Sequence, residues 1–475
     1  MIAGGELRIS LQDALRYAMA RNLEILSGAY DPLIANEAVT AADGLFDTLL
    51  TAGFEASRIE TPSNIVFQTS DVTRDETVTG YVGASRRMRN GGHLAVLFRA
   101  DRIFTNSDIA SSNPTTGGTA ELEYVQPLLR GAGYVATADV RRARNGARSA
   151  DYTQRALVDD VLLRTEIAYW NFVFARGNTE ARRKSEQVAR ELLDQTKIRF
   201  DAKVATVLDL ADARAGHESR RGDRIGSEGL EGQLEDALRA LIFPFEGARN
   251  LRLRILPTDD PRALPGSEKP DAGQEERYVS QAVRARPELL AAHADLENRD
   301  IDIETARDEL KPQLDLVGRL STSGLEGAGW NAFEDTLTGE ATGAAVGIAF
   351  SVYLGRRTAW ANVRSADWSR RQTALRLREL ENRVVQEVRF ALRELSTARS
   401  RGVAAAEELS AAREALDGEQ LKERNGESTP FRVLEKEDLV TQAAVREDRS
   451  AADVRIATAR LWRAIGLLAD ARGLR

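Results

Sequence analysis

Residues 341–354, ATGAAVGIAFSVYL, contain the pattern that decides the fold. Apolar side chains occupy every second position from Ala344 to Val352, and glycine, alanine or serine fills the positions between them. A period of two residues predicts a β-strand with one apolar face and one small or polar face. Runs of about ten such residues are typical of membrane-spanning strands, although a sandwich strand with one solvated face has the same pattern.

The first half of the chain contains similar runs. LLTAGFEAS (49–57) and TAELEY (119–124) alternate in the same way. TVTGYVGASRRM and HLAVLFRADRIF, joined through Asn90-Gly91-Gly92, predict a hairpin over 77–104. If the strands span a bilayer, the lipid-facing residues include Leu50, Phe54, Ile348 and Phe350, and the lumen-facing residues include Thr51, Glu55, Gly343 and Gly347.

Long helical patterns surround these strands. One apolar stripe at three- and four-residue steps consists of Val158, Val161, Leu162, Thr165, Ala168, Tyr169 and Phe172. Near the end of the chain the spacing becomes heptad-like and predicts a coiled-coil seam with one Glu in it. This seam consists of Val440, Ala444, Glu447, Ala451, Val454, Thr458, Leu461, Ile465 and Leu468.

The helix before each set of strands is repeated. ARNLEILSGA (20–29) and RARPELLAAH (284–293) share their order of residue types, and 264 residues separate Glu24 from Glu288. Ala18 and Ala282 have the same spacing, as do Ala42 and Ala306. A period this long, seen twice, indicates a duplicated half-protein rather than a solenoid of short units.

The duplication predicts two structural repeats joined by a linker. The first repeat is 1–242, with a helix over 10–45, strands over about 49–126 and a helical hairpin over about 134–242. The Pro-rich linker is 243–276. The second repeat is 277–475, with a helix over 277–311, strands over about 313–354 and a helical hairpin over about 358–469. Pro287 suits the first turn of a helix, because its missing N–H is not needed there.

Composition excludes several functions. The formal charge is −7, from 66 basic and 73 acidic residues, which argues against nucleic acid as a partner. The absence of cysteine excludes disulfides, thiolate catalysis and Cys-based zinc sites. No apolar run approaches the roughly 20 residues of a membrane helix. MIAGGELRIS does not resemble a signal peptide, so the protein is expected either to stay in the cytoplasm or to carry a leader that is not printed.

One motif has the spacing of a dinucleotide-binding site. Gly131, Gly133 and Ala136 form a G-x-G-x-x-A between a strand and a helix, as in dinucleotide-binding folds. Pro127 lies in the preceding strand, where a central strand needs an N–H, and the following helical pattern is too long for a βαβ unit. The three His residues lack metal-ligand spacing, so we expect no cofactor, no metal and no enzyme activity.

The order of several strings resembles the TolC-like outer-membrane efflux proteins. ALRYAMARNLEIL and AVRARPELLAAH begin the repeats, and VQPLLRGAG and DELKPQLDL mark the helix–strand junctions at Pro127 and Pro312. TEIAYWNFVFAR lies in a long helix, and FDAKVATVLDLADA and ERNGESTPFRVLEKED form the hairpin tips. Together these strings cover nearly the whole chain.

The resemblance implies an α+β membrane protein. Its outer-membrane β-barrel strands continue into a long α-helical coiled-coil barrel, with two structural repeats per protomer and three protomers. Such proteins are passive export conduits that lie in the outer membrane and reach into the periplasm. Their partners are a periplasmic adaptor and an inner-membrane transporter of the RND or ABC type.

The resemblance also implies roles at the hairpin tips. Asp209 matches an acidic latch position, Glu435 an acidic position facing the entrance, and Arg432 stands where a second acid is expected. We therefore expect Asp209 and Arg432 to pair and help to close the entrance. The expected adaptor-contact residues are Lys203, Val204, Ala205, Thr206, Gly426, Ser428, Thr429 and Pro430.

The chain departs from the family at three places. Lys203 occupies a tip position where glycine is usual, the hairpin at 77–104 is additional to two strands per repeat, and five glycines punctuate a helix over 216–232. Trp330, Phe333, Tyr353 and Trp360 are candidates for an interfacial belt. The alternative function is that of a soluble coiled-coil scaffold, which leaves the alternating runs without an explanation.

Overall fold

The computed structural model describes residues 2–3, 6–62, 71–243, 254–263, 272–326, 336, 341–425 and 427–474. The chain divides into two compact units, each built from segments of both repeats. Unit one comprises 1–32, 149–292 and 376–475, and unit two comprises 33–148 and 293–375.

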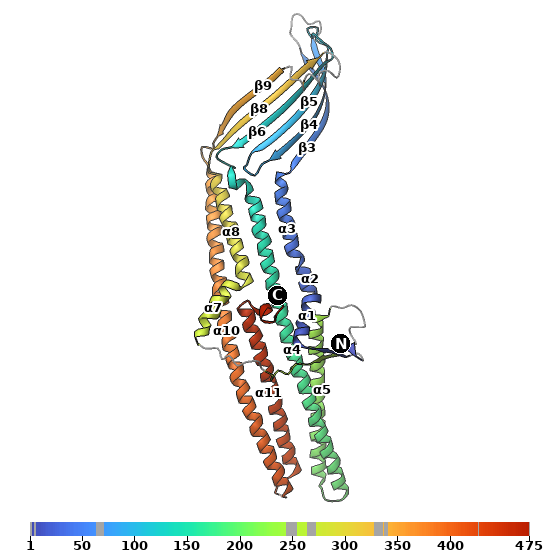
Figure 1. Ribbon diagram of the computed structural model, residues 1–475. Helices are drawn as coiled ribbons and strands as arrows, with labels where there is room; N and C mark the ends of the chain where they lie inside the picture. The colour runs from blue at the N-terminus through green and yellow to red at the C-terminus, as the bar shows by residue number, and fades with distance from the viewer. Residues whose placement is uncertain are drawn as a thin grey trace. The chain divides into compact units, whose positions relative to one another are not determined.

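Unit two contains a six-stranded antiparallel sheet in the order β3-β4-β5-β6-β8-β9 (Figure 1). Its strands are β3 (Thr48–Pro62), β4 (Val72–Arg87), β5 (His93–Thr105), β6 (Thr115–Pro127), β8 (Gln313–Glu326) and β9 (Ala341–Ser351). The predicted hairpin over 77–104 is confirmed as β4 and β5. The two repeats join where β6 pairs with β8.

The register places apolar residues side by side across the whole sheet. One row runs through Leu50, Ala84, Val96, Leu122, Leu320 and Ala344. The row on the opposite face runs through Thr51, Gly83, Leu97, Glu121, Ser321 and Gly343. The apolar face is open, because Phe54 is 75% exposed and Val346 is 82% exposed.

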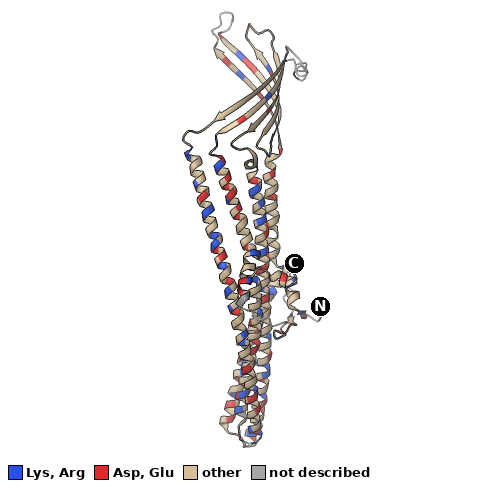
Figure 2. Ribbon diagram, turned by 60° about the vertical axis from the view of Figure 1, so that its left-hand side comes forward, with Lys and Arg blue, Asp and Glu red and all other residues tan. Residues whose placement is uncertain are grey.

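The helices of unit two include three that are joined by ion pairs. The helices of this unit are α3 (Tyr30–Asp43), the first turns of α4 (Ala138–Asp201), most of α8 (Pro287–Asp308) and the start of α10 (Arg357–Arg424). Acidic residues of α8 pair with Arg141 and Arg142 of α4 and with Arg370 of α10. Figure 2 shows how densely charged residues line these helices.

Unit one packs helices around a small sheet. Its elements are β1 (Ile2–Ala3), β2 (Glu6–Ile9), α1 (Leu11–Arg21), α2 (Leu23–Gly28), the rest of α4, α5 (Val207–Ile242), β7 (Arg254–Pro257), α7 (Ala272–Ala285), the rest of α10, α11 (Pro430–Ala464) and α12 (Leu468–Ala471). Strand β2 pairs in parallel with β7. The core between α1, α4, α5 and α11 contains Ile9, Ala14, Ala18, Tyr169, Phe172, Leu238, Ile242, Ile255, Ala452 and Ile456.

The helical stretches predicted over 10–45 and 277–311 are present, as α1 to α3 and as α7 and α8, but neither is a single helix. Both are interrupted at equivalent places of the repeat, at Asn22 between α1 and α2 and at Arg286 between α7 and α8. Asn22 leaves the helical conformation, with ψ 123°, and its side-chain oxygen accepts the N–H groups of Glu24 and Ile25. Arg286 precedes Pro287, which disfavours the helical conformation there. Pro287 begins α8, as its sequence position predicts.

The repeated glutamates lie in the first turns after these two breaks. Glu24 pairs with Arg164 of α4 at 2.6 Å, and Glu288 pairs with Arg463 of α11 at 2.7 Å. The duplicated strings therefore encode a helix break followed by an ion pair to a long helix. Both ion pairs lie in unit one.

The predicted seam of α11 is only partly correct. Val454, Leu461, Ile465 and Leu468 are buried, but so are residues outside the seam, namely Ala443, Ala452, Ile456, Ala457 and Ala459. The helix is covered on more than one side, so its apolar positions do not follow a single heptad line. Glu447, which interrupts the seam, pairs with Arg262 at 3.0 Å.

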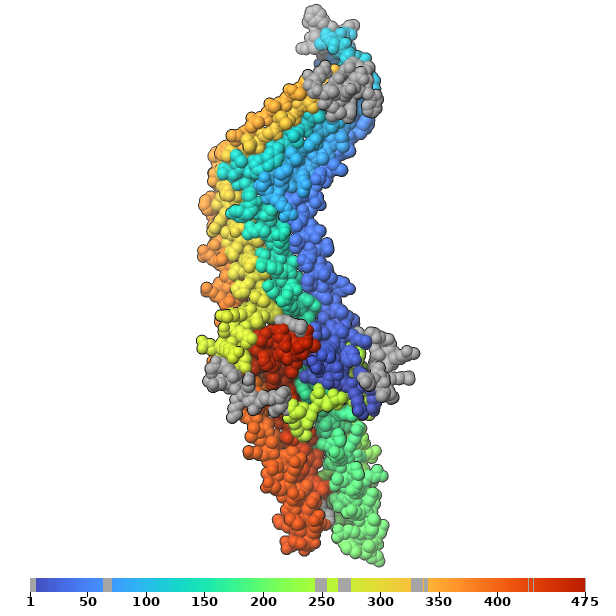
Figure 3. Space-filling view, in the orientation of Figure 1, coloured from blue at the N-terminus to red at the C-terminus, as the bar shows by residue number. Residues whose placement is uncertain are grey.

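Arg262 belongs to residues 254–263, here called the strap. In the strap, the Asp259 carboxylate accepts hydrogen bonds from the Tyr169 hydroxyl at 2.7 Å and from the Leu11 N–H at 2.6 Å. These two bonds attach the strap to α4 and α1. Burial and the hydrogen bond to Asp259 raise the pKa of Tyr169, which therefore stays a donor at any physiological pH. Figure 3 shows the strap and α12 on the face of unit one turned toward the viewer.

Replacing Tyr169 by phenylalanine is expected to destabilise unit one by about 1.5–3 kcal/mol, the usual value of a hydrogen bond to a charged group. The ring packing remains, while the partly buried carboxylate of Asp259 loses one of its donors. Thermal unfolding followed by circular dichroism measures the change. Tyr152→Phe on the same helix is the control, and equal midpoints for the two variants would contradict this role of the strap.

Among the described residues, none of the helices combines the length and apolar character that crossing a membrane requires.

Candidate functional site at the helical tips

The first tip is a tight turn between α4 and α5. The N–H groups of Val204 and Ala205 both bond to the carbonyl of Arg199, at 2.8 and 3.2 Å. Lys203 has φ 59°, in the left-handed region that glycine adopts most readily. The lysine therefore keeps the turn that the usual glycine forms, at a conformational cost.

Thr206 and Asp209 begin α5 with a reciprocal capping box. The Thr206 hydroxyl accepts the Asp209 N–H at 3.1 Å, and the Asp209 carboxylate accepts the Thr206 N–H at 2.8 Å and its hydroxyl at 2.7 Å. These bonds from Thr206 hold the pKa of Asp209 below its usual value. Asp209 is therefore charged at neutral pH and directed at the start of its own helix.

The second tip joins α10 to α11, which Pro430 begins. The Ser428 hydroxyl donates to the carboxylate of Glu419 on α10. This bond, with nearby Lys422 and Arg432, holds the pKa of Glu419 below its usual value. Gly426 lies outside the described residues.

The structure does not bring Asp209 and Arg432 together in this chain. Among the described residues no ion pair joins them, and Arg432 instead acts on Glu419. Asp209 and two residues of the second hairpin, Thr429 and Phe431, line one cavity of about 200 Å³. The cavity is lined by Leu192, Thr196, Arg199, Val204, Ala205, Asp209, Asp212, Ala213, Thr429, Phe431 and Leu434. Glu435 is exposed on α11.

Exposed apolar side chains surround the first tip. Ile198, Val204, Val207 and Leu208 are each about 70% exposed, and Phe431 of the second tip is 58% exposed. Sequence reasoning had included Val204 but missed Ile198, Val207 and Leu208. The signal for Val207 and Leu208 is an apolar pair in the first turn of a helix capped by Thr206 and Asp209, where polar residues are expected if the tip faces only water.

The buried carboxylate of Asp308 connects the two helix–strand junctions at Pro127 and Pro312. Pro127 ends β6 and Pro312 precedes β8, while Asp308, at the end of α8, accepts the Gly131 N–H at 2.6 Å and pairs with Lys311 at 2.7 Å. Gly131 and Gly133 have φ of 80° and 68°, so the glycines of the cofactor-like motif form the turn into α4. Sequence reasoning missed Asp308.

The aromatic residues expected at an interface are only partly described. Tyr353 is 79% exposed and Trp360 is 51% exposed. Trp330 and Phe333 lie outside the described residues.

Known proteins resemble this chain in sequence and in fold. Residues 278–467 match the outer membrane efflux protein family. The outer membrane protein TolC of Vibrio cholerae serotype O1 is 26% identical over 220 residues, which span 46% of each protein. The sequence match with that relative therefore covers about half of its length.

The fold is shared more widely. The CmeC outer membrane channel of Campylobacter jejuni has a TM-score of 0.70 at 16% identity, covering 96% of this chain and 86% of that one. The open-state MtrE outer membrane channel of Neisseria gonorrhoeae has a TM-score of 0.66 at 18% identity, covering 96% and 89%. The sequence of the second repeat is therefore similar to the outer membrane efflux protein family, and nearly the whole chain has the fold of outer membrane channels.

Proposed function

We propose that the chain is the outer-membrane channel subunit of a tripartite efflux or type I secretion system. The observation that carries the proposal is the exposed apolar face of the six-stranded sheet. Large apolar patches on soluble proteins are rare, and a sheet that spans a bilayer needs such a face toward lipid. The opposite face carries Arg319 between Glu121 and Glu123, which suits a water-filled lumen.

The sheet is suited to closing with other copies. β3 and β9 are its two edge strands, and strand directions alternate, so β9 of one copy runs antiparallel to β3 of the next. A ring of copies therefore pairs every edge, as a bilayer requires. We propose the homotrimer of the family, with its barrel continued into a helical tunnel. The additional hairpin β4–β5 makes this barrel wider than one with two strands per repeat.

The tips are proposed to serve two functions. The exposed apolar residues of the first tip and the starts of α5 and α11 supply a docking surface for a periplasmic adaptor. This adaptor connects the channel to an inner-membrane transporter of the RND or ABC type. Asp209, Arg432 and Glu435 bias the entrance toward closure. Because Asp209 and Arg432 do not pair within one chain, their proposed contact is one between copies.

Single-channel recording tests the channel and the gate together. The chain is fused to a cleavable leader, extracted from membranes and inserted into a planar bilayer, where discrete long-lived steps are expected. Thr206→Ala and Asp209→Asn both weaken the capping box, but only the second removes the carboxylate charge. Asp209→Asn is expected to raise the resting conductance severalfold, and Thr206→Ala is expected to leave it near that of the parent.

Two results would overturn these proposals. An absence of steps, with the protein recovered from the soluble fraction, would favour the coiled-coil scaffold. Equal conductance for the parent and Asp209→Asn would remove Asp209 from the gate while leaving the channel intact.

A further inference from the structure

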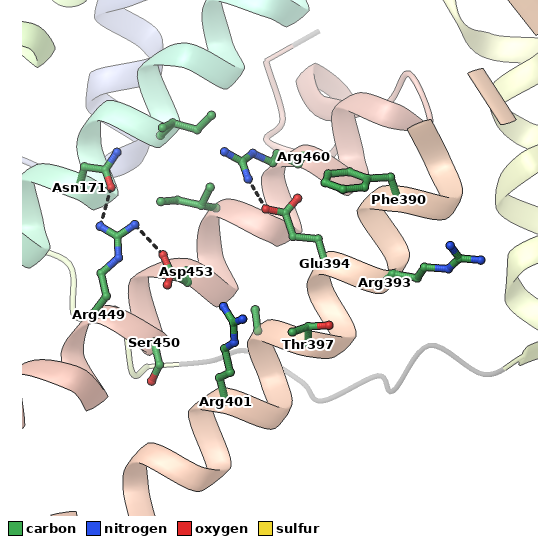
Figure 4. A pocket seen from close by; sticks show the side chains of 13 residues that line it. Asn171, Phe390, Arg393, Glu394, Thr397, Arg401, Arg449, Ser450, Asp453 and Arg460 are labelled. Atoms are coloured by element: carbon green, nitrogen blue, oxygen red, sulfur yellow. Dashed lines mark hydrogen bonds and ion pairs between the residues drawn. The ribbon is translucent and has the colours of Figure 1, made fainter. Parts of the chain in front are cut away.

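A groove lies between α4, α10 and α11 within unit one (Figure 4). Its volume is about 500 Å³. Its apolar wall contains Ile167, Phe390, Ala398 and Ile456, and Phe390 is 67% exposed. Asn171, Thr397 and Ser450 add neutral polar groups. The groove therefore offers both an apolar surface and hydrogen-bonding groups to a small organic molecule.

The charge of the groove is positive. It contains four arginines and two carboxylates, and both carboxylates are neutralised within it. Glu394 pairs with Arg460, and Asp453 pairs with Arg449, whose second nitrogen donates to Asn171 at 3.1 Å. In the part of the chain that the structure describes, Arg393 and Arg401 have neither a hydrogen-bond nor an ion-pair partner. Two guanidinium groups are therefore available to an anion.

Figure 4 shows how the two free arginines differ. Arg401 extends from α10 toward the Arg449–Asp453 pair on α11, whereas Arg393 lies on the rim of the groove. Thr397 lies between them on the same side of α10. Guanidinium groups bind carboxylates and sulfonates through paired N–H donors, so Arg401 is the primary contact and Arg393 a second one at the rim.

The groove lies on the face of the helix layer opposite the strap. On α4, Tyr169 contacts the strap while Asn171 lines the groove, and two residues along an α-helix correspond to a rotation of about 200°. Leu15 of α1 and Leu468 of α12 pack with Leu162, on the Tyr169 side of α4. In a conduit built from this helix layer, the strap, α1 and α12 have to lie on the outer side, because on the inner side they would block the passage. The groove side is therefore the lining.

We propose that this groove binds small organic anions that carry a carboxylate or sulfonate on an apolar body, and that it forms an anion subsite in the wall of the conduit. The position of the groove in the conduit wall rests on the proposed channel function. The class of ligand rests on the residues of the groove itself. Each copy contributes one groove, so a symmetric assembly carries a ring of them at one level. The ring raises the local concentration of anions, because clustered charge in a cleft focuses the electric field.

The test compares the parent with Arg393→Gln/Arg401→Gln in two measurements. Naphthalene-2-sulfonate is the probe, and its binding to the detergent-solubilised full chain is followed by equilibrium dialysis against a detergent blank. In planar bilayers, the reversal potential in a potassium chloride gradient gives the chloride/potassium permeability ratio. Arg413→Gln, which removes an exposed arginine of α10 outside the groove, is the control.

The double variant is expected to bind naphthalene-2-sulfonate about tenfold or more weakly, since two charge-assisted contacts are lost. Its chloride/potassium ratio is expected to fall about twofold or more. Arg401→Glu is expected to lower both values further, and Arg413→Gln is expected to match the parent. Unchanged binding in the double variant overturns the anion site.

The outcomes separate the site from the channel. Weaker binding with an unchanged permeability ratio overturns the placement in the conduit wall. A parent chain that forms no steps overturns the proposed channel, and the dialysis result still decides whether the groove binds anions.

Discussion

Replacing Arg472 by alanine is expected to destabilise the protein by about 3–5 kcal/mol, the usual consequence of leaving one member of a buried ion pair alone. Arg472 follows α12 and pairs with Glu166 of α4, whose side chain is completely buried. Trp170 donates a long hydrogen bond of 3.5 Å to the same carboxylate, and Arg455 adds a nearby positive charge. Neither replaces the contact that Arg472 makes.

The effect of Arg472→Ala is expected to depend on pH. Burial raises the pKa of Glu166, and Arg472 opposes that shift. An acid whose pKa is raised in the folded state stabilises the fold below its unfolded pKa and loses that contribution as the pH rises through the folded pKa. Without Arg472 the pKa rises further, so the destabilisation is largest at alkaline pH and shrinks as Glu166 becomes protonated.

Thermal unfolding at several pH values measures this dependence. Arg164→Ala is the matched control, because it breaks a partly exposed pair with Glu24 that contributes only about 0–1 kcal/mol. Glu166→Leu/Arg472→Leu is expected to recover most of the loss, since no buried charge remains. If Arg472→Ala unfolds at the same temperature as Arg164→Ala, the pair does not anchor α12.

Leu320→Arg is expected to prevent stable insertion of the protein into the outer membrane. Leu320 belongs to the apolar row of the sheet and is 55% exposed. An arginine facing lipid near the bilayer midplane costs about 2–4 kcal/mol per strand, and a symmetric assembly incurs this cost in every copy. Membrane fractionation, followed by gel analysis of the assembled species, measures the loss.

Ser321→Arg is the matched control for this experiment. Ser321 is the next residue of β8 and points to the opposite face, where it lies beside Glu121 in the register. In the proposed channel an arginine there faces the lumen and the carboxylate of Glu121, so assembly is expected to continue. In a soluble scaffold both faces meet water, and Leu320→Arg would then be as harmless as Ser321→Arg, which would contradict the membrane assignment.

The strand predictions were successful because their signal is local. In β9, large apolar residues alternate with small residues position by position, so no distant contact is needed to recognise the strand. The glycine-punctuated helix over 216–232 is part of continuous α5, and a Cβ added at Gly222, Gly226 or Gly229 would meet open space. These glycines are not required by packing within the chain.

The break at Asn22 and the partner of Asp209 could not be predicted from the periodicity of neighbouring residues. The residues at 10–45 have helical periodicity throughout, yet the Asn22 side chain also donates to the carbonyl of Leu241, 219 residues away. Asp209 matches a latch position by resemblance, but its nearest donor is Thr206 of its own helix start. The capping box of Thr206 and Asp209 can be recognised in the sequence. Its hydrogen bonds compete with a distant partner such as Arg432 for the Asp209 carboxylate.

The alternating strands and the additional hairpin could be read from the spacing of neighbouring residues, and the duplication from a spacing of 264 residues between similar strings. The helical tips were expected from the resemblance to a family. The tertiary structure alone decided the pairing of β6 with β8, the attachment of the strap to Tyr169, and the pair between Glu166 and Arg472, whose positions differ by 306 residues. It also assembled the anion groove from α4, α10 and α11. Such partners are set by which segments lie side by side after folding, and no periodicity along one segment specifies them.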